Sequence, residues 1–290
     1  MPYTAWVSPL VATEAPDKIG RWSPSAILQS VRRPAIAIVG MGCLGTALFG
    51  RLTEAGYSVK GISRKGGATS LLNADVVWFC VPDGEIVRAA HSFSQLQWQG
   101  KSAFHSSGVL SSDALNCLRT TGGRVASVHP LMTFVKGSLP ELTGVPFAIE
   151  GDASAVRASK AIVRNLGGQA VAIKKQDKVA YHAFATMICP LLVSLLAASE
   201  KTAAHAGMSA RESRRRMLPI IRQTLRNYEK LGPAAAFSGP IVRGDVETIR
   251  AHLKALSKVP SAKDAYSALA RAAMNFLPNR NRRQVVQLFD

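Results

Sequence analysis

Apolar residues form short runs separated by turn residues over the first 175 positions of the chain. The first run, AIAIVG (35–40), is β-branched and typical of a strand buried on both faces. Further runs predict strands in YSVKGIS (57–63), ADVVWFC (74–80), KSAFHSSG (101–108), RVASVHPLMTF (124–134), PFAIE (146–150) and QAVAIKK (169–175). Apolar positions recur at helical spacing from Leu44 to Ala55 and over 153–166. This alternation predicts an α/β domain with a doubly wound sheet.

The pattern becomes almost purely helical beyond residue 175. A long apolar segment spans 177–206 and ends at Gly207. Ser209 and Glu212 form a capping-box pattern for a helix to residue 231, in which Pro219 predicts a kink. After the loop GPAAAFSGPIVRGD (232–245), Asp245 is placed to cap a helix through 256, and another helix is predicted over 262–276. We therefore divide the chain into a loosely ordered N-terminal extension (1–33), a nucleotide-binding domain (34–175) and a helical domain (176–290).

One segment tests whether the chain enters a membrane. Residues 179–198, VAYHAFATMICPLLVSLLAA, carry no formal charge over a length that could span a bilayer. Polar residues and a proline interrupt the segment, and its apolar part is no longer than a buried helix needs; the interrupting residues are Tyr181, His182, Thr186, Pro190 and Ser194. We interpret it as a buried helix and expect no membrane partner.

Cysteine usage and the first residues point to the cytoplasm. The four cysteines are scattered, without a CxxC pair or zinc-ligand spacing, so we expect reduced thiols and no metal. The first residues lack a basic region ahead of an apolar core, which makes a secretory signal a poor interpretation.

The net charge of +18 is unevenly distributed. Residues 1–150 hold 13 Lys and Arg against 9 Asp and Glu, whereas residues 151–290 hold 23 against 9. Such a charge favours anionic partners. Four arginines, Arg211, Arg215, Arg222 and Arg226, fall on one side of a predicted helix. Only Tyr228 lies near them, and nucleic-acid binding would require interleaved aromatic residues, so we interpret this side as a solvated face.

A glycine motif follows the first predicted strand directly. Gly40 permits a tight turn, Gly42 lets the backbone approach a pyrophosphate, and Gly45 lets the helix pack close to the strand. A phosphate then meets free N–H groups at the helix N-terminus. Because the strand, the helix and a second strand are all in place, we predict a dinucleotide-binding turn made of Gly40, Met41, Gly42, Cys43, Leu44 and Gly45.

The end of the second strand indicates which dinucleotide binds. An NAD site usually places Asp or Glu there, to hold the ribose 2′-hydroxyl, whereas a 2′-phosphate requires hydroxyl and cationic groups. This chain has Ser63, Arg64 and Lys65, which favours NADP as the cofactor. The alternative is that these three residues only form a solvated basic turn. Only about eleven residues separate Arg64 from Val76, so we expect one strand-helix unit to be reduced.

Several motifs together resemble a known family of proteins. Besides the glycine turn they are FHSSG (104–108), SVHPLMTF (127–134), YHAFATM (181–187) and SGPIVRGD (238–245). The chain resembles oxidoreductases that join a Rossmann-like NADP-binding domain to a small helical domain of the 6-phosphogluconate dehydrogenase C-terminal type. Relatives of that family include pyrroline-5-carboxylate reductase, ketopantoate reductase and prephenate dehydrogenase. The resemblance implies an oxidoreductase of unassigned substrate that forms a homodimer through its helical domain.

The chain departs from that family at one position. Members commonly carry Ser-Asn some eight residues after the Tyr-His pair, whereas this chain has Cys189-Pro190. Pro190 removes a polar side chain and predicts a kink in the long helix. Any role that the asparagine has in relatives is therefore in doubt here.

Three residues are candidates for proton transfer. His129 ends a predicted strand, can donate or accept a proton near neutral pH, and lies in a His-Pro-Leu segment that resembles the His-Pro-Met segment of prephenate dehydrogenases. Lys178 and His182 lie four residues apart on one helix face, where β-hydroxyacid dehydrogenases carry Lys-x-x-x-Asn. The structural alternatives are that the His129 ring only makes hydrogen bonds to the backbone, and that Tyr181 and His182 only pack the interdomain hinge.

Other residues are candidates for ligand binding. The turn Val81-Pro82-Asp83 and Ser106 end strands at the edge where dinucleotides bind, so we assign them to the cofactor. His105 and Ser107 are assigned to the substrate, as are Arg243, which can bind a carboxylate or phosphate, and Asp245, which is otherwise a helix cap.

The sequence therefore predicts a cytoplasmic, NADP-dependent oxidoreductase acting on a small, anionic keto, hydroxy or imino acid between two domains. Two alternatives remain: a non-catalytic NADP-binding regulatory protein, which Pro190 favours, and a nucleic-acid-binding protein, which the basic second half favours.

Overall fold

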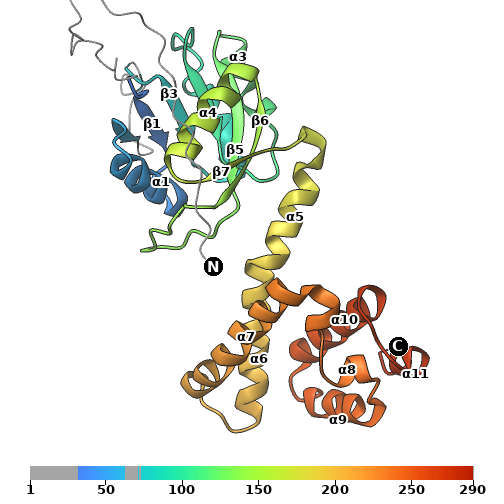
Figure 1. Cartoon of the computed structure of the whole chain (residues 1–290). Helices are drawn as coiled ribbons and strands as arrows, with labels where there is room; N and C mark the ends of the chain where they lie inside the picture. Colours follow the sequence, from blue (N-terminus) through green and yellow to red (C-terminus); the bar gives the residue numbers. More distant parts are fainter. Residues whose placement is uncertain (1–31, 63–70, 72, 290) are drawn as a thin grey trace, which may run out of the picture.

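A seven-stranded sheet forms the first part of the computed structural model, which describes residues 32–62, 71 and 73–289 (Figure 1). The strand order is β2-β1-β3-β4-β5-β6-β7, and all neighbours are parallel except β5 and β6. The strands are β1 (Ile36–Val39), β2 (Val59–Ile62), β3 (Val76–Phe79), β4 (Ser102–His105), β5 (Arg124–Pro130), β6 (Pro146–Gly151) and β7 (Gln169–Ala172). Every strand predicted from the sequence is confirmed.

Helices cover both faces of this sheet. On one face, α1 (Cys43–Glu54) and α4 (Ala153–Asn165) bury Leu48, Leu52 and Ile162 against Ile38 and Trp78. On the other face, α2 (Asp83–His91) and α3 (Asn116–Arg119) pack against Val77 and Phe79, together with the 3₁₀ turn η2 (Ser112–Leu115). Strand residues therefore alternate between two apolar cores, as expected for a sheet buried on both faces.

The parallel strands bring several loops to one edge of the sheet. Val39 pairs with Phe79, Phe79 with His105, and His105 with Ser127, so β1, β3 and β4 end at the same level, and β5 continues three residues further to Pro130. In doubly wound sheets, ligands bind outside this carboxyl edge. The glycine turn and His129 therefore lie at the edge where a ligand is expected.

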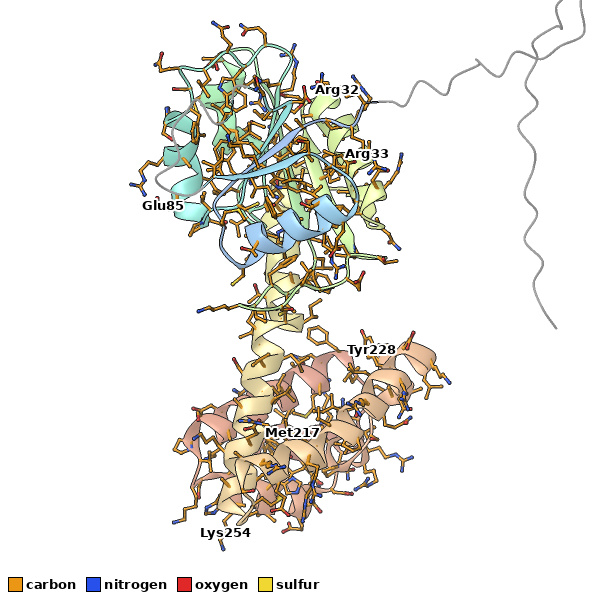
Figure 2. The ribbon with its side chains drawn as sticks, turned by 90° about the vertical axis from the view of Figure 1, so that its left-hand side faces the viewer. Arg32, Arg33, Glu85, Met217, Tyr228 and Lys254 are labelled. Atoms are coloured by element: carbon orange, nitrogen blue, oxygen red, sulfur yellow. The ribbon has the colours of Figure 1, made fainter. Side chains whose placement is uncertain are left out.

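The remainder of the chain is helical and starts with the 3₁₀ turn η3 (Lys175–Asp177). Its helices are α5 (Lys178–Ile188), α6 (Pro190–His205), α7 (Ala210–Ala236), α8 (Pro240–Arg243), α9 (Val246–Leu256), α10 (Pro260–Phe276) and α11 (Arg282–Val286). A small core joins α9, α10 and α11 through Ile249, Ala270, Met274 and Val285. Figure 2 shows the sheet part and the helical part as two bodies connected by α5.

The two prolines within predicted helices behave differently. Cys189, just before Pro190, has φ −119° and ψ −83°, and the predicted single helix is divided there into α5 and α6. At Pro219, where a kink was predicted, the backbone angles stay helical, and the residue inside α7 with non-helical angles is Gly232, at φ 73°. Ser209 caps α7 as predicted, since its side chain accepts a hydrogen bond from the Glu212 N–H.

Much apolar surface remains exposed on the helical part. Val179, Met187 and Val193 on α5 and α6 are each more than 60% exposed, as is Ile220 on α7. By length and composition, Lys175–His205 could cross a membrane; its mean hydropathy is 1.8, and none of its most apolar window is buried. The interpretation of 179–198 as a helix buried within one chain is therefore wrong. A single segment of this kind is weak evidence for a membrane span.

Candidate functional site

The glycine turn joins β1 to α1 and leaves the start of the helix open. Gly40 has φ +98°, and a Cβ there would lie 2.7 Å from Val81 Cγ1. A Cβ at Gly45 would overlap the Gly40 carbonyl oxygen, so only glycine allows this helix–strand approach. Nothing lies within 4 Å of a Cβ at Gly42. No side chain caps α1 and its first turn holds no acidic residue, so its first N–H groups are available to an anion.

The neighbouring turn, Val81-Pro82-Asp83, leads from β3 into α2. Asp83 is the first residue of α2, and its carboxylate Oδ2 accepts a 2.8 Å hydrogen bond from the Ser107 hydroxyl. The Ser107 hydroxyl in turn accepts hydrogen bonds from the Val109 and Leu110 N–H groups. Ser107 therefore fixes the loop after β4, and its hydroxyl has no free position for the substrate to which the sequence assigned it.

His105 and Ser106 are also turned inward. His105 is completely buried, its Nε2–H donates to the Ser111 carbonyl, and its Nδ1 accepts from the Ser107 N–H. Burial lowers the pKa of His105 to about 4, so the ring is neutral. The Ser106 hydroxyl accepts a 2.8 Å hydrogen bond from the Trp78 indole N–H. Both ring nitrogens of His105 are therefore used inside the fold, which argues against its assignment to the substrate, whereas the assignment of Ser106 to the cofactor stays a prediction.

His129 occupies the end of β5, where its ring is partly exposed. Its Nδ1–H donates a 3.0 Å hydrogen bond to the Ser106 carbonyl, which can only accept. This bond fixes the tautomer and leaves the Nε2 lone pair free. Burial lowers the pKa of His129, assisted by the charge of Lys178 and the nearby His182. The ring is thus neutral at pH 7 and accepts protons at Nε2.

Lys178 is the first residue of α5, and it is almost fully buried, with 1% of its surface exposed. Its ammonium group donates to the Ser127 hydroxyl at 2.7 Å and to the Ser107 carbonyl at 3.1 Å. Burial lowers the pKa of Lys178, while the carboxylates of Glu150 and Asp83 oppose that shift. Lys178 therefore joins the ends of β4 and β5 to α5, and the proton transfer predicted for it stays a prediction.

His182 lies one helical turn after Lys178 and faces the same edge. Its ring centroid is 5.8 Å from that of His129, at an interplanar angle of 72°. Tyr181 packs edge-on against His129 with ring centroids 6.2 Å apart. A Cβ at Gly108 would overlap the His182 ring and lie 3.0 Å from His129 Cε1. The predicted common face of Lys178 and His182 is confirmed, and the two histidines meet over a glycine.

Gly108 was not predicted as part of the site, and Tyr181 was predicted only as a packing residue of the interdomain hinge. Gly108 ends the FHSSG motif, and a glycine directly after a strand is a signal of close backbone approach. The position of Tyr181 beside His182 was visible, but its contact with His129 depends on the angle between α5 and the sheet, which spacing alone does not give.

Other predicted residues lie elsewhere. Arg243 and Asp245, at α8 and the start of α9, form an exposed ion pair at 2.7 Å within the helical part. Asp245 precedes α9 as predicted but makes no side-chain cap. Ser63, Arg64 and Lys65 lie outside the described residues, as does most of the 1–33 extension and of the shortened 64–76 connection. Within the described ranges, no group of three His, Cys, Asp or Glu residues is placed to hold a metal.

Part of the chain matches the sequence model of a protein family. Residues 145–273 match the family described as a domain of unknown function, DUF2520. The DUF2520 segment begins one residue before β6 and ends in α10, so it includes two strands of the sheet and most of the helical part. Curated proteins give no sequence match to this chain.

Solved structures share the fold over most of the chain. A provisionally named NADP oxidoreductase from Bacteroides fragilis has 20% identity and a TM-score of 0.69, covering 83% of this chain and 97% of its own. A reductive aminase from Aspergillus terreus, in complex with NADPH and ethyl-5-oxohexanoate, has 13% identity and a TM-score of 0.61, covering 88% and 99%. A Plasmodium falciparum pyrroline carboxylate reductase with NADP bound has 14% identity and a TM-score of 0.54, covering 82% and 98%. These likenesses confirm the predicted architecture of a Rossmann-like domain followed by a helical domain.

Proposed function

We propose that this protein is an NADP-dependent oxidoreductase acting on a small, anionic keto, hydroxy or imino acid. The observation that carries the proposal is the open glycine turn at the same sheet edge as the free Nε2 of His129. Three inter-strand spacings separate β1 from β5, which is roughly 14 Å. One extended dinucleotide can therefore bind the turn and reach the histidines.

The glycine turn fits the diphosphate of such a cofactor. The space beside Gly42 is open, and the uncapped N-terminus of α1 supplies N–H donors and a positive dipole end. Bound there, NADPH would supply the hydride that reduces a carbonyl or imine. The choice of NADP rests on Ser63, Arg64 and Lys65 and is supported by solved structures of this fold named with NADP or NADPH.

His129 is the group that moves a proton in this proposal. Because Nδ1–H is held by the Ser106 carbonyl, the proton is gained or lost at Nε2. The lowered pKa makes the neutral ring the main form at pH 7, so the ring accepts a proton from a hydroxyl when the substrate is oxidised. Protonation at lower pH prepares the ring to donate, and we expect reduction to become faster below neutral pH. His182 is close enough to His129 to share hydrogen bonding to the substrate.

The anionic character of the substrate follows from the charge of the protein. The net charge is +18, and among the residues that the structure describes, the site near His129 carries buried Lys178 as its nearest cation. Figure 1 shows α8, which ends at Arg243, in the helical part of the chain, whereas β5, which carries His129, lies in the sheet part. An anchoring role for Arg243 therefore requires a second copy.

We propose that this second copy covers the exposed helices. Apolar residues of α5, α6 and α7 continue into a groove of about 540 Å³ that is lined by α6, α9 and α10 and includes Leu195 and Leu269. Figure 2 labels Met217 and Tyr228, two residues of α7 in the helical part. An apolar surface of this extent marks an interface. A homodimer in the cytoplasm accounts for it without a membrane.

A non-catalytic NADP-binding regulator is the second candidate function, and the observation that favours it is Pro190. The residue divides the helix between the sheet and the helical part and brings no polar side chain to the site. The two candidates differ in turnover rather than in cofactor binding.

The test is NADPH oxidation with a panel of small keto and imino acids. We expect His129→Asn to lower kcat by roughly a hundredfold, with unchanged affinity for NADPH, because a general acid–base group typically contributes that factor. The control is His91→Asn, at an exposed end of α2, which should act like the wild type. The wild-type rate should also rise from pH 8 to pH 6. NADPH binding without turnover on any substrate would support the regulator instead.

A further inference from the structure

A second cavity adjoins the glycine turn on the outer side of α1. Its volume is about 710 Å³, and it lies between the first two turns of α1 and the loop that connects β5 to β6. The turn contributes Met41, Gly42 and Cys43 to its lining, and the loop contributes residues 135–139. The lining is mainly apolar, and Lys136 is the one charged residue in it. The cavity is therefore lined both by the open N-terminus of α1 and by one cation, Lys136, from a distant part of the sequence.

The loop is fixed against α1 rather than loosely placed over it. Arg51, in the last turn of α1, donates hydrogen bonds to the Leu139 and Pro140 carbonyls at 2.8 and 3.0 Å and pairs with Glu141 at 2.6 Å. A Cβ at Gly50 would lie only 3.1 Å from Leu139 Cδ1, so a glycine lets the loop rest on the helix. These contacts hold the wall of the cavity in place before any ligand arrives.

Lys136 stands at the tip of a tight turn within this loop. The Ser138 N–H bonds to the Val135 carbonyl at 3.0 Å, and Gly137 has φ +77°, as a type II turn requires at its third residue. Within the described part of the chain, Lys136 forms no hydrogen bond or ion pair, and no carboxylate lines the cavity. Its charge is therefore available to a ligand in the cavity.

We propose that Lys136 is a cofactor-binding residue that pairs with the diphosphate of the dinucleotide held at the glycine turn. The inference rests on the proposed function and adds a contact from the β5–β6 loop to it. The first N–H groups of α1 bind one side of the diphosphate, and the Lys136 ammonium neutralises the opposite side. The 2′-phosphate is a less suitable partner, because it binds beyond the end of β2, and β2 contributes no residue to this cavity.

The experiment compares NADPH and NADH binding by calorimetry for four proteins. They are the wild type, Lys136→Gln, Lys136→Arg and Lys60→Gln. Lys60 lies in β2 and lines a small cavity at the opposite edge of the sheet, so its variant makes the same charge change away from the turn. Both substituted residues, Lys136 and Lys60, are exposed, so we expect equal melting temperatures for the four proteins.

We expect Lys136→Gln to weaken the binding of both dinucleotides by about tenfold, which is the contribution of one charge-assisted contact at an accessible site. Lys136→Arg should retain most of the affinity, and Lys60→Gln should bind as the wild type does. Unchanged binding by Lys136→Gln, or a loss confined to NADPH, would overturn the inference while leaving the proposed function intact. A wild type that binds neither dinucleotide would contradict both the inference about Lys136 and the proposed function.

Discussion

At the scale of residues, burial gives the histidines of the sheet edge different chemistry. His105 has both ring nitrogens bonded inside the fold, whereas His129 keeps Nε2 free. His105 is the last residue of β4, and His129 is the last but one of β5, at the same edge of the sheet. The difference arises because His105 points into the core beneath η2, while His129 faces α5.

The burial of His105 predicts a pH dependence of stability. The folded protein holds the pKa of His105 near 4, while an unfolded histidine has a pKa of about 6.5. Between these values the unfolded chain binds more protons, so the free energy of unfolding falls as the pH is lowered from 6.5 to 4. We expect this histidine to account for about 3 kcal/mol of that loss.

Urea unfolding at several pH values measures this loss against His105→Gln, whose side chain does not titrate in this range. The variant should be the less stable protein at pH 7 and should approach the wild type by pH 4.5. A constant difference between the two proteins over this range would show that His105 does not titrate as the structure implies.

Single residues also show how far the sequence could predict the site. Gly40 and Gly45 were assigned correctly as a tight turn and a close helix–strand contact, because their effect is on the local backbone. The bonds of Ser107 and Lys178 could not be predicted. They join α2, β4, β5 and α5, and no local pattern records which polar groups meet inside a folded core.

At the scale of elements, strands and helices followed the apolar pattern closely, and the exceptions have physical causes. Pro190 is the first residue of α6, a position that suits proline, and the chain turns at Cys189 directly before it. The long predicted helix is therefore divided there. Pro219 lies within α7 without non-helical angles. The positive φ of Gly232 ends the regular part of that helix instead.

The exposed face of α5, α6 and α7 predicts self-association. Val193→Glu, on α6, places a charge in this face and should convert a homodimer to a monomer. Val87→Glu is the matched control, since Val87 is a 46% exposed residue of α2 on the sheet part. Sedimentation of the three proteins checks this expectation. A monomeric wild type, or wild-type protein that floats with lipid vesicles, would contradict the dimer.

At the scale of the whole molecule, two parts with different kinds of surface are joined by α5. The sheet part carries an open carboxyl edge, and the helical part carries an apolar face together with 18 of the 36 Lys and Arg residues. Lys178 and His182 connect the parts, because each contacts residues at the ends of β4 and β5. A change in the position of α5 would therefore alter the surroundings of His129 directly.

The most direct test of this account is dinucleotide binding at Gly42. A Cβ at this position meets nothing within 4 Å, and its φ of −77° suits any residue, so Gly42→Val should fold with an unchanged melting temperature. The valine would occupy the space proposed for the diphosphate. Calorimetric titration should show saturable binding to the wild type, tighter for NADPH than for NADH, and no binding to Gly42→Val. Equal affinity of the two proteins for NADPH, or a wild type that binds neither dinucleotide, would contradict the account.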